Sequence, residues 1–158
     1  MGKFIIVAGS PNSGKTITVN LVVNKLIDNG YKNIGGLNDN SEQNFWEIRN
    51  RNGEHTTGGS IILERKGYKI ILISYGDNLN SLEGLFNKIK FDNYDAIICC
   101  SHATRGKNIF EFFHEKIRNI DLNKTKVIPI YKNLLANNDR NNEENEFVSN
   151  LIVDFLQK

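Results

Sequence analysis

The chain has 158 residues, 39% of them hydrophobic and 24% charged, with a formal net charge of +2. This length suits one domain with its own core, so we expect a single domain over residues 1–158. The small charge indicates neither a nucleic-acid nor a membrane partner, and no apolar run approaches the roughly 20 residues of a membrane-spanning helix. Two adjacent cysteines form no disulfide framework, so we expect a cytoplasmic protein.

The first third of the chain predicts a strand, a helix and a second, short strand. KFIIVA, residues 3–8, is a continuous apolar run typical of a strand covered on both faces. The next elements are a helix over 17–30, ending at Asn29-Gly30, and a short strand over 33–37. The helix is predicted from apolar residues at helical spacing: Val19, Val22, Val23, Leu26 and Ile27.

The middle of the chain predicts antiparallel pairing. Apolar and polar residues alternate there, and turn signals occur at Asn52-Gly53, Gly58-Gly59 and Lys66-Gly67. This pattern predicts strands at about 44–50, 60–65 and 68–74, the last of them a core strand.

The rest of the chain returns to alternating helices and strands, which favours an α/β fold with a mainly parallel sheet and inserted antiparallel hairpin strands. Pro129, inside the last predicted strand, indicates an edge position or a strand end. The expected elements are helices over 79–90, 108–120 and 146–158, strands over 94–100 and 126–131, and polar loops over 101–107 and 137–145.

One motif stands out, the stretch GSPNSGKT that follows the first predicted strand and precedes the first predicted helix. Gly9, Gly14, Lys15 and Thr16 match G-x-x-x-x-G-K-S/T. Glycines let a backbone curl so that its N–H groups face phosphate oxygens, and the helix that follows adds free N–H donors. The lysine ammonium would lie between the β- and γ-phosphates, and the threonine hydroxyl would bind Mg²⁺.

At these residues the chain resembles the P-loop nucleoside triphosphatases, and the stretch 68–107 looks similar to small bacterial and phage P-loop proteins. The resemblance implies a P-loop three-layer α/β/α fold, a single nucleotide-binding domain over residues 1–158, and ATP and Mg²⁺ as ligands. The residues that would bind the nucleotide are Gly9, Ser10, Pro11, Asn12, Ser13, Gly14, Lys15, Thr16 and Ile17.

Such proteins carry an acidic residue at the end of a core strand, where it holds Mg²⁺ directly or through water. Asp77 follows the strand over 68–74, which we expect beside the first strand, and is the candidate for this role together with Thr16. Ser74 is a second candidate for contact with water or Mg²⁺. The alternative role for Asp77 is to cap the helix that follows.

A third element is the loop over 101–107, which should emerge at the same edge of the sheet as the phosphate loop. Arg105 could neutralise phosphate charge, stack on the base or stabilise charge in the transition state, and Lys107 could also contact phosphate. The alternative is a solvated basic loop. His102 is expected to be a loop residue, since neither other histidine has metal-ligand spacing from it.

Neighbouring members of the superfamily narrow the choice of ligand. GTP-binding members carry Asn-Lys-x-Asp after a late strand. In this chain the nearest match is NKTK, residues 123–126, which lacks the aspartate and precedes a predicted strand instead of following one. ATP is therefore the default base, with GTP not excluded. Small kinases carry acceptor-binding charges after an early strand. Asp39, Glu42, Arg49 and Arg51 occur there, although surface charge is the favoured interpretation.

The leading hypothesis is an enzyme that hydrolyses or transfers the γ-phosphoryl group of ATP with Mg²⁺, using Lys15, Asp77 and Arg105. A second hypothesis is a nucleotide-dependent switch that binds a protein partner. Phe45 and Trp46 are then the aromatic residues to test, with core packing as their alternative role. A third is a small-molecule or nucleotide kinase. The sequence indicates neither the phosphate acceptor nor the oligomeric state.

Overall fold

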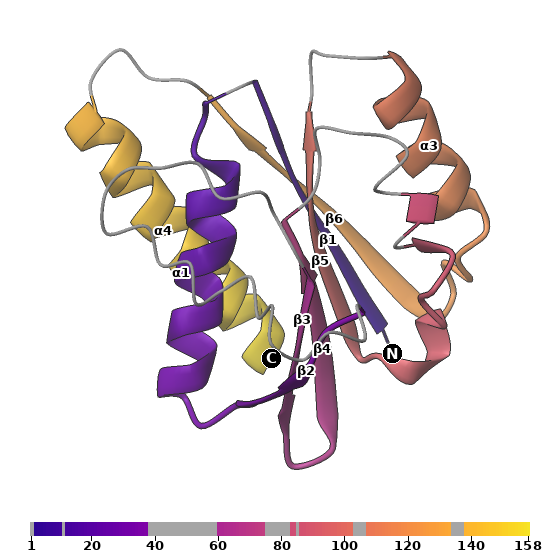
Figure 1. Ribbon diagram of the computed structural model, residues 1–158. Helices are drawn as coiled ribbons and strands as arrows, with labels where there is room; N and C mark the ends of the chain where they lie inside the picture. The colour runs from indigo at the N-terminus through magenta and orange to yellow at the C-terminus, as the bar shows by residue number, and fades with distance from the viewer. Residues whose placement is uncertain are drawn as a thin grey trace.

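The computed structural model describes residues 2–10, 12–37, 60–74, 83–84, 86–102, 107–133 and 138–158. Over these residues the chain forms an α/β fold around one six-stranded sheet, with the strand order β2-β3-β4-β5-β1-β6 (Figure 1). The elements are β1 Gly2–Gly9, α1 Lys15–Asp28, β2 Lys32–Gly35, β3 Ser60–Arg65, β4 Tyr68–Ile73, a 3₁₀ turn Phe91–Asn93, β5 Ala96–His102, α3 Lys107–Arg118, β6 Thr125–Lys132 and α4 Asn138–Gln157.

Four strands of the sheet, β4, β5, β1 and β6, run parallel, and β3 and β2 are added antiparallel at one side. Gly9, the last residue of β1, pairs with His102 of β5 and with Lys132 of β6. The carboxyl ends of these three strands therefore lie level at one edge of the sheet, at the top of Figure 1.

The expectation that residues 68–74 lie beside the first strand is wrong. β4 pairs with β3 and β5, and β5 separates it from β1. The end of β4 is thus two strand spacings from the end of β1, or about 10 Å. Apolar runs such as β4 and β5 predict burial within a sheet but carry no signal for which of them pairs with β1.

The helices cover both faces of the sheet and make three layers (Figure 1). Helices α1 and α4 pack on one face, over a cluster that includes Ile5, Val22, Ile98 and Ile152. Helix α3 packs on the other face, over a second buried cluster in which the Phe4 ring contacts the rings of Phe86 and Phe113. This cluster includes Ile71, Phe86, Ile97, Cys99, Phe112 and Phe113. Among the described residues no helix combines the length and apolarity needed to cross a membrane.

Two predicted chain reversals are confirmed. The β3–β4 hairpin turns at Lys66 and Gly67, whose φ angles of 52° and 82° are those of a two-residue type I′ turn. Asn29 is the C-cap residue of α1, and Gly30 follows with φ of 87°. The Gly30 N–H donates to the Ile27 carbonyl and the Tyr31 N–H to that of Leu26, which completes a Schellman motif.

Single residues of the strands and helices mostly follow the predicted pattern. Pro129 lies in β6, which is an edge strand as predicted. Cys99 and Cys100 are buried on opposite faces of β5, as alternation along a strand requires. Ile27 lies in α1 as its spacing predicts, but its side chain is 38% exposed. It lies about 100° around the helix from Leu26, beyond the stripe that faces the sheet.

The polar loop predicted over 137–145 is also wrong, because α4 begins at Asn138. The segment is rich in asparagine, which has a low intrinsic helix propensity. Tertiary contacts outweigh that propensity here. Glu144 forms an ion pair with Lys132, Asn145 is 2% exposed, and Glu146 forms an ion pair with Lys25 of α1. In the helix predicted over 79–90, Glu83, Gly84 and Phe86 are helical, and residues 89–90 are not.

Candidate phosphate site

The segment between β1 and α1 is a tightly curled loop at the carboxyl edge of the sheet. Asn12 and Gly14 have φ angles of 61° and 79°, in the left-handed region. The Ser13 N–H donates to the Ser10 carbonyl at 3.3 Å, which closes the first turn of the loop. Alternating right- and left-handed backbone of this kind points successive N–H groups toward one centre, which suits an anion.

Gly9 has no space for a side chain. A Cβ atom at this position would lie 2.5 Å from Ser13 Oγ and 2.6 Å from the Lys132 carbonyl oxygen. Glycine at the start of the motif is therefore required by close packing between the loop and β6. The Ser13 hydroxyl is itself fully buried and has no hydrogen-bond partner among the described residues. A buried hydroxyl without a partner is uncommon in proteins and marks a position where a ligand can supply one.

The start of helix α1 also suits an anion. Gly14 is the N-cap residue, no side chain caps the helix, and its first turn contains no acidic residue. Thr18 donates the first intrahelical bond, to the Gly14 carbonyl at 2.8 Å. The N–H groups that precede it have no intrahelical acceptor, and the helix dipole places partial positive charge at the same end. Together they make this end of α1 suitable for phosphate.

Lys15 lies inside the loop rather than in solvent. Its side chain is 6% exposed, and its ammonium donates to the Ser10 carbonyl at 2.8 Å. The charge is therefore held within the curl of the backbone. Thr16 is partly exposed, and the Ile17 side chain is 51% exposed, so Ile17 could contact a ligand only through its backbone N–H.

Helix α4 supports the loop through Asn145. A Cβ atom on Gly14 would overlap the Asn145 amide, with Nδ2 at 2.9 Å and Cγ at 3.0 Å. Thr18 Oγ1 is 2.9 Å from the Gly14 carbonyl oxygen and 3.2 Å from Asn145 Oδ1, so its proton is shared between two acceptors. Asn145 thus fixes the position at which the loop becomes a helix. Sequence reasoning missed this residue, because it assigned residues 137–145 to a loop.

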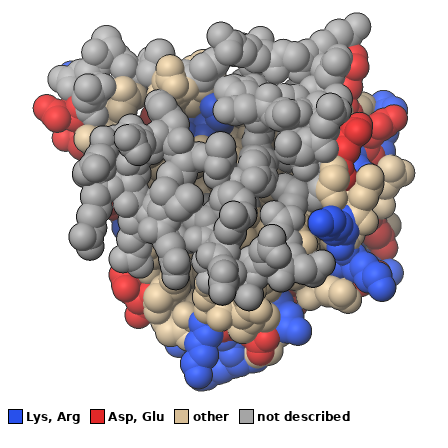
Figure 2. Space-filling view, viewed as in Figure 1, with Lys and Arg blue, Asp and Glu red and all other residues tan. Residues whose placement is uncertain are grey.

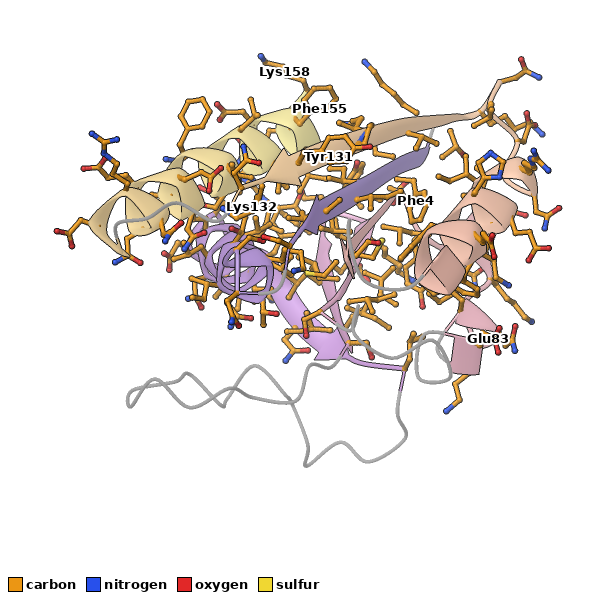
Figure 3. The ribbon with its side chains drawn as sticks, turned by 90° about the horizontal axis from the view of Figure 1, so that it is seen from above. Phe4, Glu83, Tyr131, Lys132, Phe155 and Lys158 are labelled. Atoms are coloured by element: carbon orange, nitrogen blue, oxygen red, sulfur yellow. The ribbon has the colours of Figure 1, made fainter. Side chains whose placement is uncertain are left out.

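Lys132 is the second residue that sequence reasoning missed. It ends β6 beside Gly9, and its side chain is fully buried and paired with Glu144 of α4 at 3.1 Å. Figure 3 looks down on this edge of the sheet and shows Lys132 between α4 and α1. The sequence signal that could have identified Lys132 is a lysine at the end of an apolar strand, since parallel strands end at the edge of the sheet where ligands bind.

The structure describes only part of the predicted site. Gly9, Ser10, Asn12, Ser13, Gly14, Lys15, Thr16 and Ile17 form one loop. His102 ends β5 at the same edge, and Ser74 is buried just after β4. The predicted residues that lie outside the described ranges are Pro11, Asp77 and Arg105, together with Asp39, Glu42, Phe45, Trp46, Arg49 and Arg51.

Comparisons with known proteins add no relative. No protein-family model, curated protein or solved structure matches this chain. The interpretation of the site therefore depends on the motif and on the geometry of the loop.

Proposed function

We propose that the chain binds a nucleoside triphosphate through residues 9–17 and cleaves or transfers its γ-phosphoryl group, as a P-loop nucleoside triphosphatase does. The observation that carries the proposal is the loop itself. It curls at the carboxyl end of β1 into an uncapped helix, with the Lys15 ammonium buried against the Ser10 carbonyl. The backbone amide donors of a helix start and a buried cation at one point favour a multiply charged phosphate.

The proposed roles follow from the positions of the groups. The N–H groups from Gly14 to Ile17 would bind phosphate oxygens, and Lys15 would exchange the Ser10 carbonyl for the β- and γ-phosphates. The Thr16 hydroxyl, at the start of α1, would be one ligand of Mg²⁺, which in such sites takes most other ligands from phosphate and water. Bound Mg²⁺ would offset the charge that develops on the phosphates.

Other parts of the proposal come from the sequence alone. Within the described ranges no group of three or more His, Cys, Asp or Glu residues is placed to hold a metal ion. Asp77 is proposed as the acidic residue that completes the Mg²⁺ site, and Arg105 as the cation that stabilises the transition state. ATP is the proposed substrate by default, because the guanine-recognition motif was not found.

Thermal unfolding with and without nucleotide tests the proposal. A ligand at 100 times its Kd stabilises the folded state by about 2.7 kcal/mol, which raises the Tm of a domain of this size by about 5–10 °C. We expect this shift with ATP and Mg²⁺ in the wild type and its loss in Lys15→Ala. Lys88→Ala, which removes an exposed lysine from a turn outside the loop, should retain the shift.

The same samples, assayed for phosphate release, separate the functional alternatives. Turnover in the wild type but not in Lys15→Ala supports an enzyme. A shift without turnover favours the nucleotide-dependent switch, and ADP production that requires an added acceptor favours a kinase. A shift in Tm with GTP but not with ATP would change the proposed base from adenine to guanine. No shift with either nucleotide refutes the proposal.

A further inference from the structure

A second cavity lies at the opposite edge of the sheet, where the parallel strands begin. Its volume is about 650 Å³, within the range of small-molecule sites. Four cationic side chains and two tyrosines line it, together with the last turn of α4. These six side chains are Lys3, Arg65, Lys126, Lys158, Tyr31 and Tyr68.

The strand register explains why the side chains that come from strands share one face of the sheet. Lys3, Tyr68 and Lys126 each lie two residues before a residue that packs in the α1/α4-side core, namely Ile5, Ile70 and Ile128. Successive side chains of a strand alternate between faces, so all three point to the same face as that core. Lys3 pairs with Lys126 across β1 and β6, and Arg65 pairs with Tyr68 across the hairpin.

The charges in this cavity are poorly balanced. The Lys3 ammonium donates to the Phe155 and Leu156 carbonyls at 2.7 and 3.3 Å, so it neutralises the end of α4. Burial, and then the charge of Lys126, lower the pKa of Lys3. No Asp or Glu side chain is among the described residues that line the cavity.

Arg65 and Lys126 have aromatic rather than anionic neighbours. The Arg65 guanidinium lies 5.9 Å from the Tyr31 ring centroid, and the Lys126 ammonium lies 5.0 Å from that of Phe155. Within the described part of the chain neither has a carboxylate partner. Figure 2 shows that Lys and Arg atoms gather at the lower edge of the molecule, where Figure 1 places the β3–β4 hairpin.

A buried hydroxyl in the same cavity also has no partner. Tyr68 Oη is buried and makes no hydrogen bond to any described residue. Burial, followed by the charge of Asp95, raises the pKa of Tyr68, so the phenol keeps its proton and remains a donor at neutral pH. Asp95 itself accepts the Lys69 N–H at 2.7 Å.

Capping of helix ends explains only part of this arrangement. Cations favour helix C-termini, and Lys3 has that role at α4. Within the described ranges Arg65, Lys126 and the Tyr68 hydroxyl bond to no helix carbonyl, so their presence in one cavity needs another explanation. Together they offer two charged donors and one neutral donor to an anion.

We propose that this cavity binds a phosphorylated small molecule, with Arg65, Lys126 and the Tyr68 hydroxyl as its phosphate ligands. It is a separate site from the phosphate loop. Lys3 and Gly9 are six residues apart on β1, which corresponds to about 20 Å. The proposal does not depend on the nucleotide site, because none of its residues belongs to that loop.

Titration with inorganic pyrophosphate, monitored by backbone amide NMR shifts, tests the assignment at each site separately. We expect saturable shifts at Lys3, Tyr68 and Lys126 that persist in Lys15→Ala, where the phosphate loop is impaired. Arg65→Gln and Lys126→Gln should each weaken the Kd at this site by roughly tenfold or more, since each removes one charged contact. Lys88→Gln, with the same loss of charge elsewhere, should leave that Kd unchanged.

Three results would overturn the proposal. The first is pyrophosphate shifts confined to the phosphate loop. The second is an equal Kd in Arg65→Gln, Lys126→Gln and the wild type, all three giving the amide spectrum of a folded protein. The third is binding of a short single-stranded oligonucleotide through these residues without binding of pyrophosphate, which would assign the surface to nucleic acid instead.

Discussion

The close approach of Asn145 to Gly14 gives the sharpest test of how α4 shapes the loop over residues 9–17. Gly14→Ala should be destabilising for two separable reasons. Its φ of 79° is in the left-handed region, which costs a non-glycine residue about 1–2 kcal/mol. Its Cβ would also overlap the Asn145 amide, and overpacking of this kind typically costs about 1–3 kcal/mol. We therefore expect a loss of about 2–5 kcal/mol in the free energy of unfolding.

A double-mutant cycle separates these two contributions. Asn145→Ala alone removes a buried hydrogen-bond partner of Thr18 and should cost about 1–2 kcal/mol. In the double variant the added methyl group occupies space that the amide has left. Of the cost of Gly14→Ala, only the backbone strain then remains. The double variant should be more stable than the sum of the single variants predicts, by about 1–3 kcal/mol.

Urea unfolding followed by circular dichroism measures all of these free energies. Gly67→Ala is the matched control, because Gly67 has φ of 82° and no atom within 4 Å of an added Cβ. It therefore reports backbone strain alone. If Gly14→Ala costs no more than Gly67→Ala, or if the cycle is additive within about 0.5 kcal/mol, Asn145 does not constrain the loop and our reasoning is refuted.

Three further predictions concern close packing and buried groups. Gly9→Ala should lower the free energy of unfolding in urea by about 2–3 kcal/mol. Gly2→Ala on the same strand, where the closest atom to an added Cβ is at 3.4 Å, should change it by less than about 0.5 kcal/mol. Equal losses in the two variants would contradict this prediction. Glu144→Leu should cost about 2–4 kcal/mol in the same assay because it leaves the Lys132 ammonium buried and unpaired, and adding Lys132→Met should recover most of that loss. Burial raises the pKa of the Cys99 thiol well above 9.0, so above pH 9 the folded state holds a proton that the unfolded chain has lost. Stability should then fall as pH rises, by up to about 1.4 kcal/mol per pH unit, and Cys99→Ala should flatten this slope between pH 9 and 10 in urea titrations.

Local patterns predicted the elements of the fold better than their arrangement. The Lys66-Gly67 turn and the Asn29-Gly30 helix end depend on backbone preferences of a few adjacent residues, and both are confirmed. The position of β5 between β4 and β1 depends instead on long crossover connections. Every one of these strands is apolar enough for a central place, so hydrophobicity alone could not order them.

The candidate site also contains residues that a local motif identifies and residues that only the tertiary fold brings to it. The stretch from Gly9 to Thr16 was found from a local motif of adjacent residues, and the structure gives it left-handed φ angles at Asn12 and Gly14 and a helix start with no side-chain cap. Asn145 and Lys132 could not be predicted as parts of the site, because nothing in their local sequence shows that α4 and β6 converge on Gly9 and Gly14. Their importance follows from tertiary packing, in which a glycine is required by a neighbour more than 100 residues away.

Helix α4 has a distinct role at each of its ends, and this affects how its variants should be interpreted. Near its start, Asn145 contacts the phosphate loop, and at its end the Phe155 carbonyl accepts a bond from Lys3 beside the second cavity. The intervening turns pack on α1 through Val148 and Ile152, which lie in the core that α1 shares. A substitution in these middle turns can shift both ends at once, because a helix moves as a nearly rigid rod over this length. Asn145→Ala is therefore a clean probe of the phosphate loop only if the amide shifts of Lys3 and Lys126 stay at their wild-type values.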